Sequence, residues 1–529
     1  MRTIITNWSV AGAAVLASIA QSCTSDKIKP QSEKPNVIFF LVDDLGWRDV
    51  GCFGSSFYET PNIDRLASEG MKFTNAYSTC HVSSPTRASI MTGRYPASIN
   101  LTDWLPGRGN HPFQKLLNNV TNQQLPMNEE TVAETLRNNG YKTAIIGKWH
   151  VGMGEYGPMK RGFDMHIPSQ YEIGWPKSYH YPFNMNGYEG NPGEYLTDRL
   201  TDEALNYIEQ NSGNPFFLYM AHFAVHDPVQ GRKDLVEKYR KKLISIPDLG
   251  GNHYILEGNP DDKNPLSRNS LNEMIKSEEY SGYKVFPDRT VKIRQRQDNI
   301  EYAAMVESMD ESLGRILQKL KELGIENNTI IIFVSDNGGM SAANFNNPRR
   351  IINSDDLDKE FLTSNLPLRG SKGWLYEGGI RVPMIIKYPG ITKGGAVCET
   401  PVISTDFYNT IIEMTGSEMP EGKITEGLSL VSLLKNKKIK DRALYWHFPH
   451  YSNHGMQSPG GAIRFGDYKL LEYFENNTVQ LFNLKNDIEE QNDIAASDPK
   501  TTEKLRKMLH LWRKSIGVND MIPNPKYSE

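Results

Sequence analysis

Two polar pairs in the sequence carry side chains of the kind that bind a hard cation. Asp43 and Asp44 directly follow one apolar run, and Asp336 and Asn337 directly follow another. Carboxylate and amide oxygens without a thiolate suit Ca²⁺ or Mg²⁺ better than zinc or copper. Either pair alone is more typical of a helix cap or a turn. Because both pairs close an apolar strand, we predict that they share one metal site.

A third segment combines polar residues, a proline and a basic side chain at the predicted start of a helix. It runs from residue 83 to 94 (SSPTRASIMTGR). Free backbone N–H groups at a helix start favour anions, and Arg87 could clamp an oxyanion through two N–H groups. The same residues also fit an ordinary helix N-terminus with a basic first turn. The segment alone does not decide between the two.

These polar groups must be positioned by the elements that precede them. Residues 36–42 (NVIFFLV) form a continuous apolar run, typical of a strand buried on both faces. Similar strands are expected at 141–146, 216–221, 329–334 and 382–387, with helices at 129–139, 201–210 and 302–323. This alternation favours an α/β fold with a large, mainly parallel or mixed sheet between helices. Ligands of such sheets bind beyond the carboxyl ends of the strands, so one shared site is expected there.

The remaining chain departs from this plan in two places. Residues 229–289 are polar, charged and turn-rich, which predicts an excursion from the sheet. After a Lys-rich stretch near 425–440, taken as a linker, short alternating runs are followed by a helical pattern at 501–515. Hairpins with one helix predict a smaller α+β subdomain with an antiparallel sheet over 440–529.

Composition excludes several classes of protein. The 529 residues are 38% hydrophobic and 23% charged, too apolar for a disordered chain. A formal charge of −4 gives no broad basic field, which makes nucleic acid an unexpected partner. The four cysteines include no CxxC pair, which excludes a disulfide scaffold and a zinc ribbon.

The N-terminal sequence is typical of a targeting segment. An apolar run from Val10 to Ala20 is too short to span a bilayer, and it leads to Ala20-Gln21-Ser22-Cys23, similar to a bacterial lipoprotein signal. We predict a signal over 1–23, lipidation of Cys23 and a polar tether over 24–34; the alternative is an ordinary secretory signal cut nearby. The protein is then exported from a bacterium, in the periplasm or anchored to the outer membrane, and contacts a membrane only through its lipid.

Six motifs in order resemble those of the type I sulfatases. The pattern Ser-x-Pro-x-Arg, followed by four residues and Thr-Gly, is similar to the maturation signature of that family and begins at Ser83. The other segments are LVDDLGW (41–47), TPNIDRLASEG (60–70), GKWHVG (147–152), SDNGG (335–339) and GSKGWLYEGGIRVP (370–383). The likeness covers roughly residues 35–495. It implies an alkaline phosphatase-like catalytic domain over 35–425.

In that family the first residue of the signature, Cys or Ser, is oxidised to formylglycine (3-oxoalanine), whose hydrate attacks sulfur and forms a sulfo-enzyme. The resemblance implies this modification at Ser83, made by the maturation enzyme that works without oxygen, because the residue is Ser rather than Cys. It also implies one Ca²⁺. The ligands implied for that ion are Asp43, Asp44, Ser83, Asp336 and Asn337.

The resemblance also assigns the charged groups around sulfur. Arg87 and Lys148 match the residues that hold the hydrate and offset its charge, and His150 matches the one that assists its turnover. His226 and Lys372 match the pair on the sulfate and leaving oxygen, with His226 as proton donor. Each could instead be an ordinary structural residue, and His222 competes with His226. Glycines beside the two lysines (147, 370 and 373) favour close backbone approach over exposed lysines.

Aromatic and His-rich loops have the composition of carbohydrate subsites, in which aromatic faces stack on sugar rings. The candidate substrate-binding residues are Asp103, Trp104, Trp175, His447 and His450, the last two in a loop that also holds His454. We expect a sulfated carbohydrate of glycan, glycosaminoglycan or mucin type, and more narrowly a sulfated galactose or N-acetylgalactosamine.

Two other functions remain open at this point. A phosphatase or phosphodiesterase of the same superfamily would need two zinc ions, whereas the ligand set supports one hard cation. A non-catalytic glycan-binding lipoprotein would result if Ser83 were never modified.

Overall fold

The computed structural model describes residues 34–169, 171–172, 174–247, 250, 253–274, 276, 289–343 and 361–528. The predicted signal with Cys23, and tether residues 24–33, lie outside the described residues. Lys34, the last residue of the predicted tether, donates a hydrogen bond from Nζ to the Asn139 carbonyl over 2.9 Å. None of the helices within the described ranges combines the length and apolar character needed to cross a membrane.

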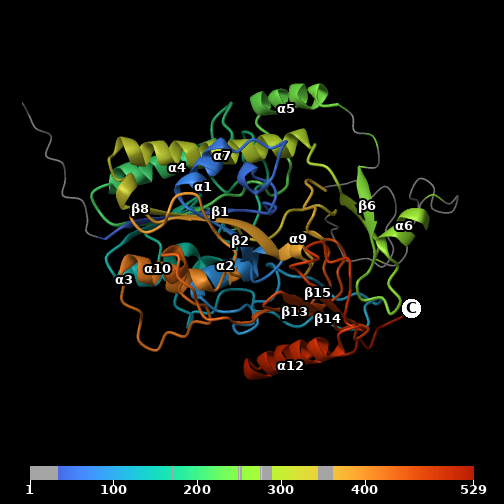
Figure 1. The fold of residues 1–529 in the computed structure, drawn as a ribbon. Helices are drawn as coiled ribbons and strands as arrows, with labels where there is room; N and C mark the ends of the chain where they lie inside the picture. The colour runs from blue at the N-terminus through green and yellow to red at the C-terminus, as the bar shows by residue number, and fades with distance from the viewer. Residues whose placement is uncertain are drawn as a thin grey trace, which may run out of the picture.

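A nine-stranded mixed sheet forms the centre of the molecule (Figure 1). Its order is β10-β2-β9-β8-β1-β5-β3-β4, with β11 paired to β2. The strands are β1 (Asn36–Val42), β2 (Met71–Tyr77), β3 (Lys142–Gly147), β4 (Met165–Ile167), β5 (Phe216–Ala221), β8 (Thr329–Ser335), β9 (Arg381–Lys387), β10 (Ala396–Cys398) and β11 (Val402–Ile403). The run from β8 to β4 is parallel, whereas β9 is antiparallel to both of its neighbours. The predicted mixed α/β sheet is confirmed.

Helices cover both faces of this sheet (Figure 1). Alternate side chains of β1 enter the two cores: Ile38, Phe40 and Val42 lie in one, and Val37, Phe39 and Leu41 in the other. The first core includes α1 (Pro61–Glu69), α4 (Leu196–Asn211), α5 (Lys233–Ser245) and α7 (Ile300–Glu322). The second includes α2 (Ser83–Thr92), α3 (Val132–Asn138), α10 (Asp406–Thr415) and α11 (Val431–Leu434).

The predicted linker near 425–440 is wrong in part. Leu430, Val431, Leu433 and Leu434 are buried in the second core, and α11 forms within this stretch. The apolar run LSLVSLL at 428–434 supplies most of the buried side chains, whereas residues 435–438 and Lys440 after it are exposed, as a linker would be.

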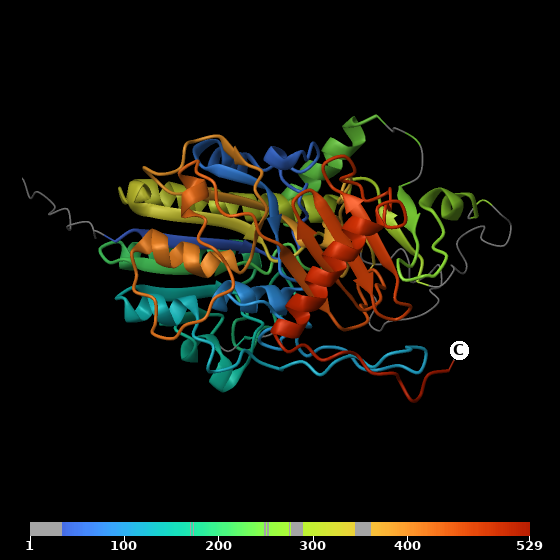
Figure 2. The same cartoon turned by 60° about the horizontal axis from the view of Figure 1, so that its bottom comes forward.

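The C-terminal part is a four-stranded antiparallel sheet with one helix across it (Figure 2). The elements are β12 (Leu444–Phe448), β13 (Gly460–Phe465), β14 (Tyr468–Tyr473), β15 (Val479–Asn483) and α12 (Pro499–Ser515). This confirms the smaller α+β subdomain. The tail after α12 lies along residues 115–117, where the Leu117 N–H donates to the Ile522 carbonyl over 2.9 Å (Figure 2).

The predicted excursion contains α5 and a small separate unit. A hairpin of β6 (Tyr254–Glu257) and β7 (Val291–Arg294) lies beside α6 (Arg268–Met274). Short turns of helix complete the described elements: α9 (Glu377–Ile380) and the 3₁₀ turns Gly51–Phe53, Gly154–Tyr156, Pro158–Lys160 and Glu326–Asn328.

Candidate active site

The predicted site residues follow the ends of four neighbouring strands, at one edge of the sheet. Asp43 and Asp44 follow β1, and Asp336 and Asn337 follow β8, its parallel neighbour. On the other side of β1, His226 lies in the loop after β5 and Lys148 directly follows β3. All are buried. The carboxyl ends of the parallel strands therefore bring together groups that are far apart in the sequence.

Ser83 joins this group from the N-terminus of α2. The preceding residue, Val82, has no side chain that could cap the helix. The Ser83 hydroxyl lies 3.2 Å from Asp43 Oδ1 and 3.4 Å from Asn337 Oδ1, and it accepts a hydrogen bond from Lys148 Nζ over 3.1 Å. The residue predicted to be modified thus contacts members of both acidic pairs.

The oxygens of the two pairs form one cluster. Asn337 Nδ2 donates to Asp44 Oδ1 over 2.7 Å, and the Asp44 backbone N–H donates to Asp336 Oδ1 over 3.1 Å. Burial, with Asp336 nearby, raises the pKa of Asp43 to about 6, although Lys148 opposes this shift. Three buried carboxylates and one amide, with no thiolate, fit a hard divalent cation.

Cationic side chains surround the same carboxylates. Arg87 donates from Nε to Asp336 Oδ2 over 3.0 Å, and Lys148 Nζ donates to Asp43 Oδ2 over 2.7 Å. Burial alone would raise the pKa of Asp336, but Arg87 and Lys148 outweigh it and hold that pKa below its usual range. Burial lowers the pKa of Lys148, against the attraction of Asp43. The site therefore holds positive charge beside the Ser83 hydroxyl.

Glycines let the backbones beside both lysines approach closely, as predicted. Gly147 has φ +107°, and a Cβ atom there would lie 1.8 Å from the Ala221 carbonyl oxygen. Gly373 has φ +86°, and its Cβ would lie 2.3 Å from the His454 carbonyl oxygen. Lys372, next to Gly373, donates from Nζ to Asp44 Oδ2 over 2.6 Å. Burial opposes its protonation, but Asp44 and Asp43 raise the pKa of Lys372.

Two histidines face the site with pKa values shifted in opposite directions. Nδ1 of His226 lies 2.6 Å from Asp227 Oδ1, and its Nε2 lies 3.7 Å from Asp44 Oδ2. Burial and Lys372 act against protonation, but Asp227 and Asp44 raise the pKa of His226 overall. His150 Nε2 donates to the Leu105 carbonyl oxygen over 2.8 Å, and burial with Lys148 nearby holds the pKa of His150 well below its usual value. A neutral His150 therefore carries its proton on Nε2 and leaves Nδ1 unprotonated.

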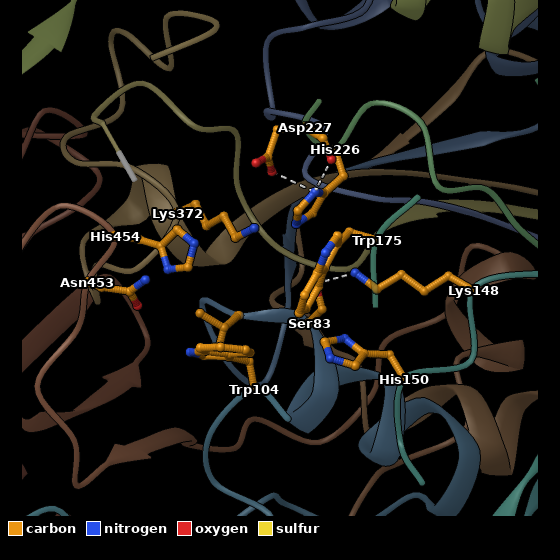
Figure 3. Close-up of a pocket in the computed structure, with 11 residues that line it drawn as sticks. Ser83, Trp104, Lys148, His150, Trp175, His226, Asp227, Lys372, Asn453 and His454 are labelled. Carbon is orange, nitrogen blue, oxygen red and sulfur yellow. Dashed lines mark hydrogen bonds and ion pairs between the residues drawn. The ribbon is translucent and has the colours of Figure 1, made fainter. Parts of the chain in front are cut away.

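A cavity of about 280 Å³ joins these groups (Figure 3). Two indole rings form part of its wall: Trp104 and Trp175, whose centroids are 6.1 Å apart in an edge-to-face arrangement. The lining residues are Val82, Ser83, Trp104, Lys148, His150, Trp175, His226, Asp227, Lys372, Asn453 and His454. The cavity therefore has a charged floor and an aromatic rim, as in sites that hold a polar group on a ring-shaped ligand.

Comparison with known proteins identifies the family. Residues 35–417 match the sulfatase family model. The chain belongs to the sulfatase family. Residues 371–515 also match the family described as N-sulphoglucosamine sulphohydrolase, C-terminal. The protein is therefore a sulfuric ester hydrolase, and the alternative of a phosphatase or phosphodiesterase finds no support in these matches.

Relatives of this sulfatase match it over nearly its whole length. It is 30% identical to a sulfatase of Formosa agariphila, over 95% of this chain and 94% of that protein. It is 27% identical to the N-acetylglucosamine-6-O-sulfatase of Bacteroides thetaiotaomicron, over 96% of this chain and 91% of the relative. Among solved structures, Ps i-CgsB in complex with k-i-k-neocarrahexaose is similar, with a TM-score of 0.66 and 28% identity over 91% of this chain and 93% of that one.

The structure of this sulfatase brings together the residues predicted to bind metal and to act in catalysis. All six predicted catalytic residues lie within the cluster described above. Five of them line the cavity, and the sixth, Arg87, lies behind it and donates to Asp336. His222, the competitor of His226, does not line it: its Nε2 lies 2.9 Å from Ser312 Oγ in the core. Of the two histidines, only His226 therefore faces the cavity.

Only two of the five predicted substrate-binding residues line the cavity. Trp104 and Trp175 line the cavity, whereas Asp103, His447 and His450 do not. Asp103 is a buried partner of Arg108, and Nε2 of His450 lies 2.9 Å from Thr102 Oγ1. His447 packs against Phe474, with ring centroids 5.7 Å apart. Asp103 and His450 therefore make contacts within the loops, whereas His447 lies in β12 and not in the loop expected from the sequence; other residues form the cavity wall.

Sequence reasoning missed two polar residues of the cavity wall, Asp227 and Asn453, and the apolar Val82. Asp227 was available as the acidic neighbour of His226 in the motif AVHDPV, at the end of a strand. Asn453 lies in the loop between β12 and β13, directly before His454. Nothing in the sequence distinguishes it from the other polar residues of that loop, because which side chain faces the cavity depends on the turn.

Proposed function

We propose that this sulfatase hydrolyses sulfate esters of carbohydrates and that Ser83 is the precursor of its formylglycine. The observation that carries the proposal is the position of Ser83, which lies at the N-terminus of α2 and lines the cavity. Its hydroxyl is within 3.1–3.4 Å of Asp43, Lys148 and Asn337. An unmodified serine hydroxyl is a weak nucleophile. A hydrated aldehyde at the same position would carry two geminal hydroxyls, one to attack and one to regenerate the aldehyde.

One Ca²⁺ fits the oxygen cluster. Asp43, Asp44, Asp336, Asn337 and the oxygen of residue 83 would hold it. When bound, the cation supplies positive charge that lowers the pKa of the neighbouring hydroxyl. His226 also lies near Asp43 and Asp44, with ligand atoms within 4.8 Å of one another. Its Nδ1 is already engaged by Asp227, so we assign His226 to proton transfer and not to the metal.

The surrounding residues balance charge and transfer protons. Arg87 and Lys148 offset the negative charge at residue 83, and Lys372 offers its ammonium to the sulfate from the opposite side. His226 holds a proton on Nε2, which faces the cavity, and donates it to the departing sugar oxygen. The neutral His150 has a free Nδ1 among the described residues and accepts a proton during turnover of residue 83.

The substrate class rests on the cavity and on the relatives. Two indole rings beside a charged floor suit a sugar ring that carries a sulfate. One relative is named for N-acetylglucosamine-6-O-sulfate hydrolysis, and one similar structure was solved with a neocarrahexaose. Both names support a sulfated sugar. The narrower expectation of a sulfated galactose or N-acetylgalactosamine stays a prediction.

The location and maturation of the protein are part of the proposal. A signal over 1–23, lipidation at Cys23 and a tether would place the enzyme in the periplasm or on the outer membrane of a bacterium. A serine at position 83 calls for a maturation enzyme of the anaerobic type. Without that enzyme the chain would be the non-catalytic lipoprotein considered above.

Mass spectrometry of the peptide containing residue 83 tests the proposal. Protein produced anaerobically with the maturation enzyme should lose two hydrogens at Ser83 and hydrolyse 4-nitrophenyl sulfate. Ser83→Ala should abolish turnover and keep the circular dichroism spectrum. Ser83→Cys is the matched control, because the family signature also accepts Cys, which a maturation enzyme for cysteine can oxidise. Sulfatase activity that survives in Ser83→Ala would overturn the assignment.

A further inference from the structure

A second cavity, of about 700 Å³, lies where the large sheet meets the C-terminal sheet. The large sheet contributes residues of β2, β9 and the β10–β11 connection, and the C-terminal part contributes the β13–β14 turn and residues after β15. Among the described residues, none lines both this cavity and the active-site cavity. We call it the junction cavity; its lining includes Trp47, Arg381, Lys440, Arg442, Phe465 and Lys485. Its volume is in the range that holds a small ligand.

Two partly buried aromatic rings belong to the wall of the junction cavity, those of Trp47 and Phe465. Trp47 Nε1 donates to the Thr74 carbonyl over 3.2 Å, and the Arg381 guanidinium lies over the indole, 4.9 Å from its centroid. Lys504 Nζ lies 5.3 Å from the centroid of Phe465. Both rings are therefore held in place while part of their surface stays open, as in cavities where aromatic faces contact a ligand.

The three arginines of this cavity are already paired within the protein. Arg381 donates from Nε to a β2 carbonyl over 2.8 Å. Arg464 donates to the Tyr77 hydroxyl, and Arg442 donates from Nη1 to Asp406 Oδ1 over 2.6 Å. These pairs fix the positions of the guanidinium groups. The arginines add positive charge to the wall, but they do not need a ligand to satisfy them.

The lysines of the junction cavity are free to meet a ligand. Lys440 and Lys485 are exposed, and within the described part of the chain neither side chain has a hydrogen bond or an ion pair. Lys440 belongs to the stretch KNKKIKDR (435–442), which holds four lysines and one arginine against one aspartate. The whole chain, by contrast, has a formal net charge of −4. Positive charge is therefore concentrated locally at this cavity.

Acidic groups at the cavity reduce this charge but do not cancel it. Three exposed carboxylates line the cavity: Glu399, Asp441 and Asp467. Five basic side chains stand against them, which leaves a formal excess of two positive charges: Arg381, Lys440, Arg442, Arg464 and Lys485. The exposed lysines that precede Lys440 in the chain add to this excess. An anionic ligand is therefore attracted to the cavity.

We propose that the junction cavity binds a sulfated segment of a polymeric glycan, as a second carbohydrate site outside the active site. Sulfate groups of such a chain would lie against Lys440 and Lys485, and its sugar rings against Trp47 and Phe465. A concave wall with two rings fits a chain of sugars better than the flat surface of an anionic membrane. The choice of a sulfated glycan as ligand rests on the proposed function, whereas the excess of positive charge does not.

Such a site would keep a polymer near the active site between turnovers. Trp47 follows Asp44 closely in the chain, so their Cα atoms are at most about 11 Å apart. Two sites that bind one polymer raise its overall affinity without any new contact at either site. The junction cavity should therefore matter for polymers and not for small esters.

Polymer binding without turnover tests the site directly. The full-length Ser83→Ala protein is titrated by calorimetry with chondroitin 6-sulfate and with chemically desulfated chondroitin. Adding Lys440→Ala and Lys485→Ala should raise the Kd for the sulfated polymer about 10-fold and make binding less sensitive to salt. Lys142→Ala with Lys160→Ala is the matched control and should leave the Kd unchanged. Both control lysines are exposed, and Lys142 begins β3, next to the strand at the opposite edge of the sheet.

Phe465 tests whether the ligand presents rings as well as charge. Phe465→Leu removes the aromatic ring and keeps apolar contact with the C-terminal core, so it should raise the Kd for chondroitin 6-sulfate about 3-fold. Phe465→Tyr keeps the ring and should bind as the parent protein does. Thermal unfolding of each variant checks that it is folded. An unchanged Kd in Phe465→Leu would contradict stacking of sugar rings at this wall.

Several results would overturn the inference. Equal losses in the two lysine pairs would show diffuse attraction by surface charge, and equal affinity for the desulfated polymer would exclude recognition of sulfate. Vesicles of phosphatidylglycerol that bind through Lys440 and Lys485, when the polymer does not, would identify a membrane surface as the ligand.

Failure of the proposed function is a separate result. A matured wild type that hydrolyses no sulfate ester contradicts that function, whereas the Kd of the Ser83→Ala protein is measured without turnover. In the matured enzyme, Lys440→Ala with Lys485→Ala should hydrolyse 4-nitrophenyl sulfate at the wild-type rate. A loss on this small ester as large as the loss of polymer affinity would contradict a site separate from the active site.

Discussion

His226 and His150 lie in one cavity, but their surroundings shift their pKa values in opposite directions. Asp227 and Asp44 raise the pKa of His226, whereas burial beside Lys148 lowers that of His150. Groups whose environments push their pKa values apart are suited to opposite proton transfers. The direct neighbours of each ring, and not its residue type, set its role.

Replacing His226 should slow the hydrolysis of esters whose leaving group must be protonated. His226→Gln removes the donor near Lys372 and should lower kcat on sugar sulfates about 100- to 10,000-fold. The loss on 4-nitrophenyl sulfate should be much smaller, because nitrophenolate leaves without a proton. Steady-state kinetics on both esters measure this difference. Equal losses would place His226 in binding the sulfate instead.

Removal of the bound cation should destabilise the folded protein, because the carboxylates of the oxygen cluster would then repel one another. Three buried carboxylates (Asp43, Asp44 and Asp336) lie together, and a cation that binds only the folded state stabilises it by about 2.7 kcal/mol at 100 times its Kd. We expect EDTA to lower Tm and Ca²⁺ to restore it, as measured by scanning calorimetry. Asp44→Asn should weaken the response. Two zinc ions per chain by metal analysis would contradict the single hard-cation site.

At the scale of elements, the order of strands and helices was predictable because apolar runs end in chemically distinctive residues. The runs that became β1, β3, β5 and β8 could be located within a residue or two. The antiparallel direction of β9 could not be predicted, since a buried strand has the same composition in either direction. The histidines near the end of β12 were harder still to place. His447, within β12, and His450 do not line the active-site cavity, whereas His454 does, and local sequence does not encode this difference.

The turn after β3 depends on a residue without a side chain. Gly147→Ala would place a methyl group against the Ala221 carbonyl at a positive φ, where L side chains are strained. We expect a loss of about 2–5 kcal/mol in the free energy of unfolding, with displacement of Lys148. Gly140→Ala is the matched control, because Gly140 has φ +87° but open space around it, and should cost only about 1 kcal/mol. Denaturant unfolding measures both; equal losses would exclude the steric argument.

At the scale of the molecule, the C-terminal sheet is part of the active site. It supplies Asn453 and His454, and it holds α9, which follows Lys372 closely in the chain. Lys469 Nζ donates to Glu377 Oε1 over 3.0 Å and lies 2.9 Å from Glu490 Oε1. Glu490 Oε2 accepts from the Glu377 backbone N–H over 2.7 Å. One buried lysine is thus shared by two carboxylates between the two sheets.

This shared lysine predicts a pH-dependent stability. Burial and the nearby Glu377 raise the pKa of Glu490 to about 7, against the pull of Lys469. An unfolded glutamate has a pKa of about 4.3, so between these values the folded state binds the extra proton and stability from this group falls as pH rises. Above about pH 7 the loss is complete.

Glu490→Gln removes this titration and keeps an oxygen that can accept from the Glu377 N–H. The wild type should therefore lose stability relative to the variant when the pH is raised from 5 to 8. The difference in free energy of unfolding, variant minus wild type, should increase by about 1–3 kcal/mol over this range. Urea unfolding at the two pH values measures the difference, with Glu489→Gln, at an exposed neighbour, as control. A constant offset between variant and wild type would show that Glu490 is ionised throughout this range, with Lys469 able to balance both carboxylates at the junction of the two sheets.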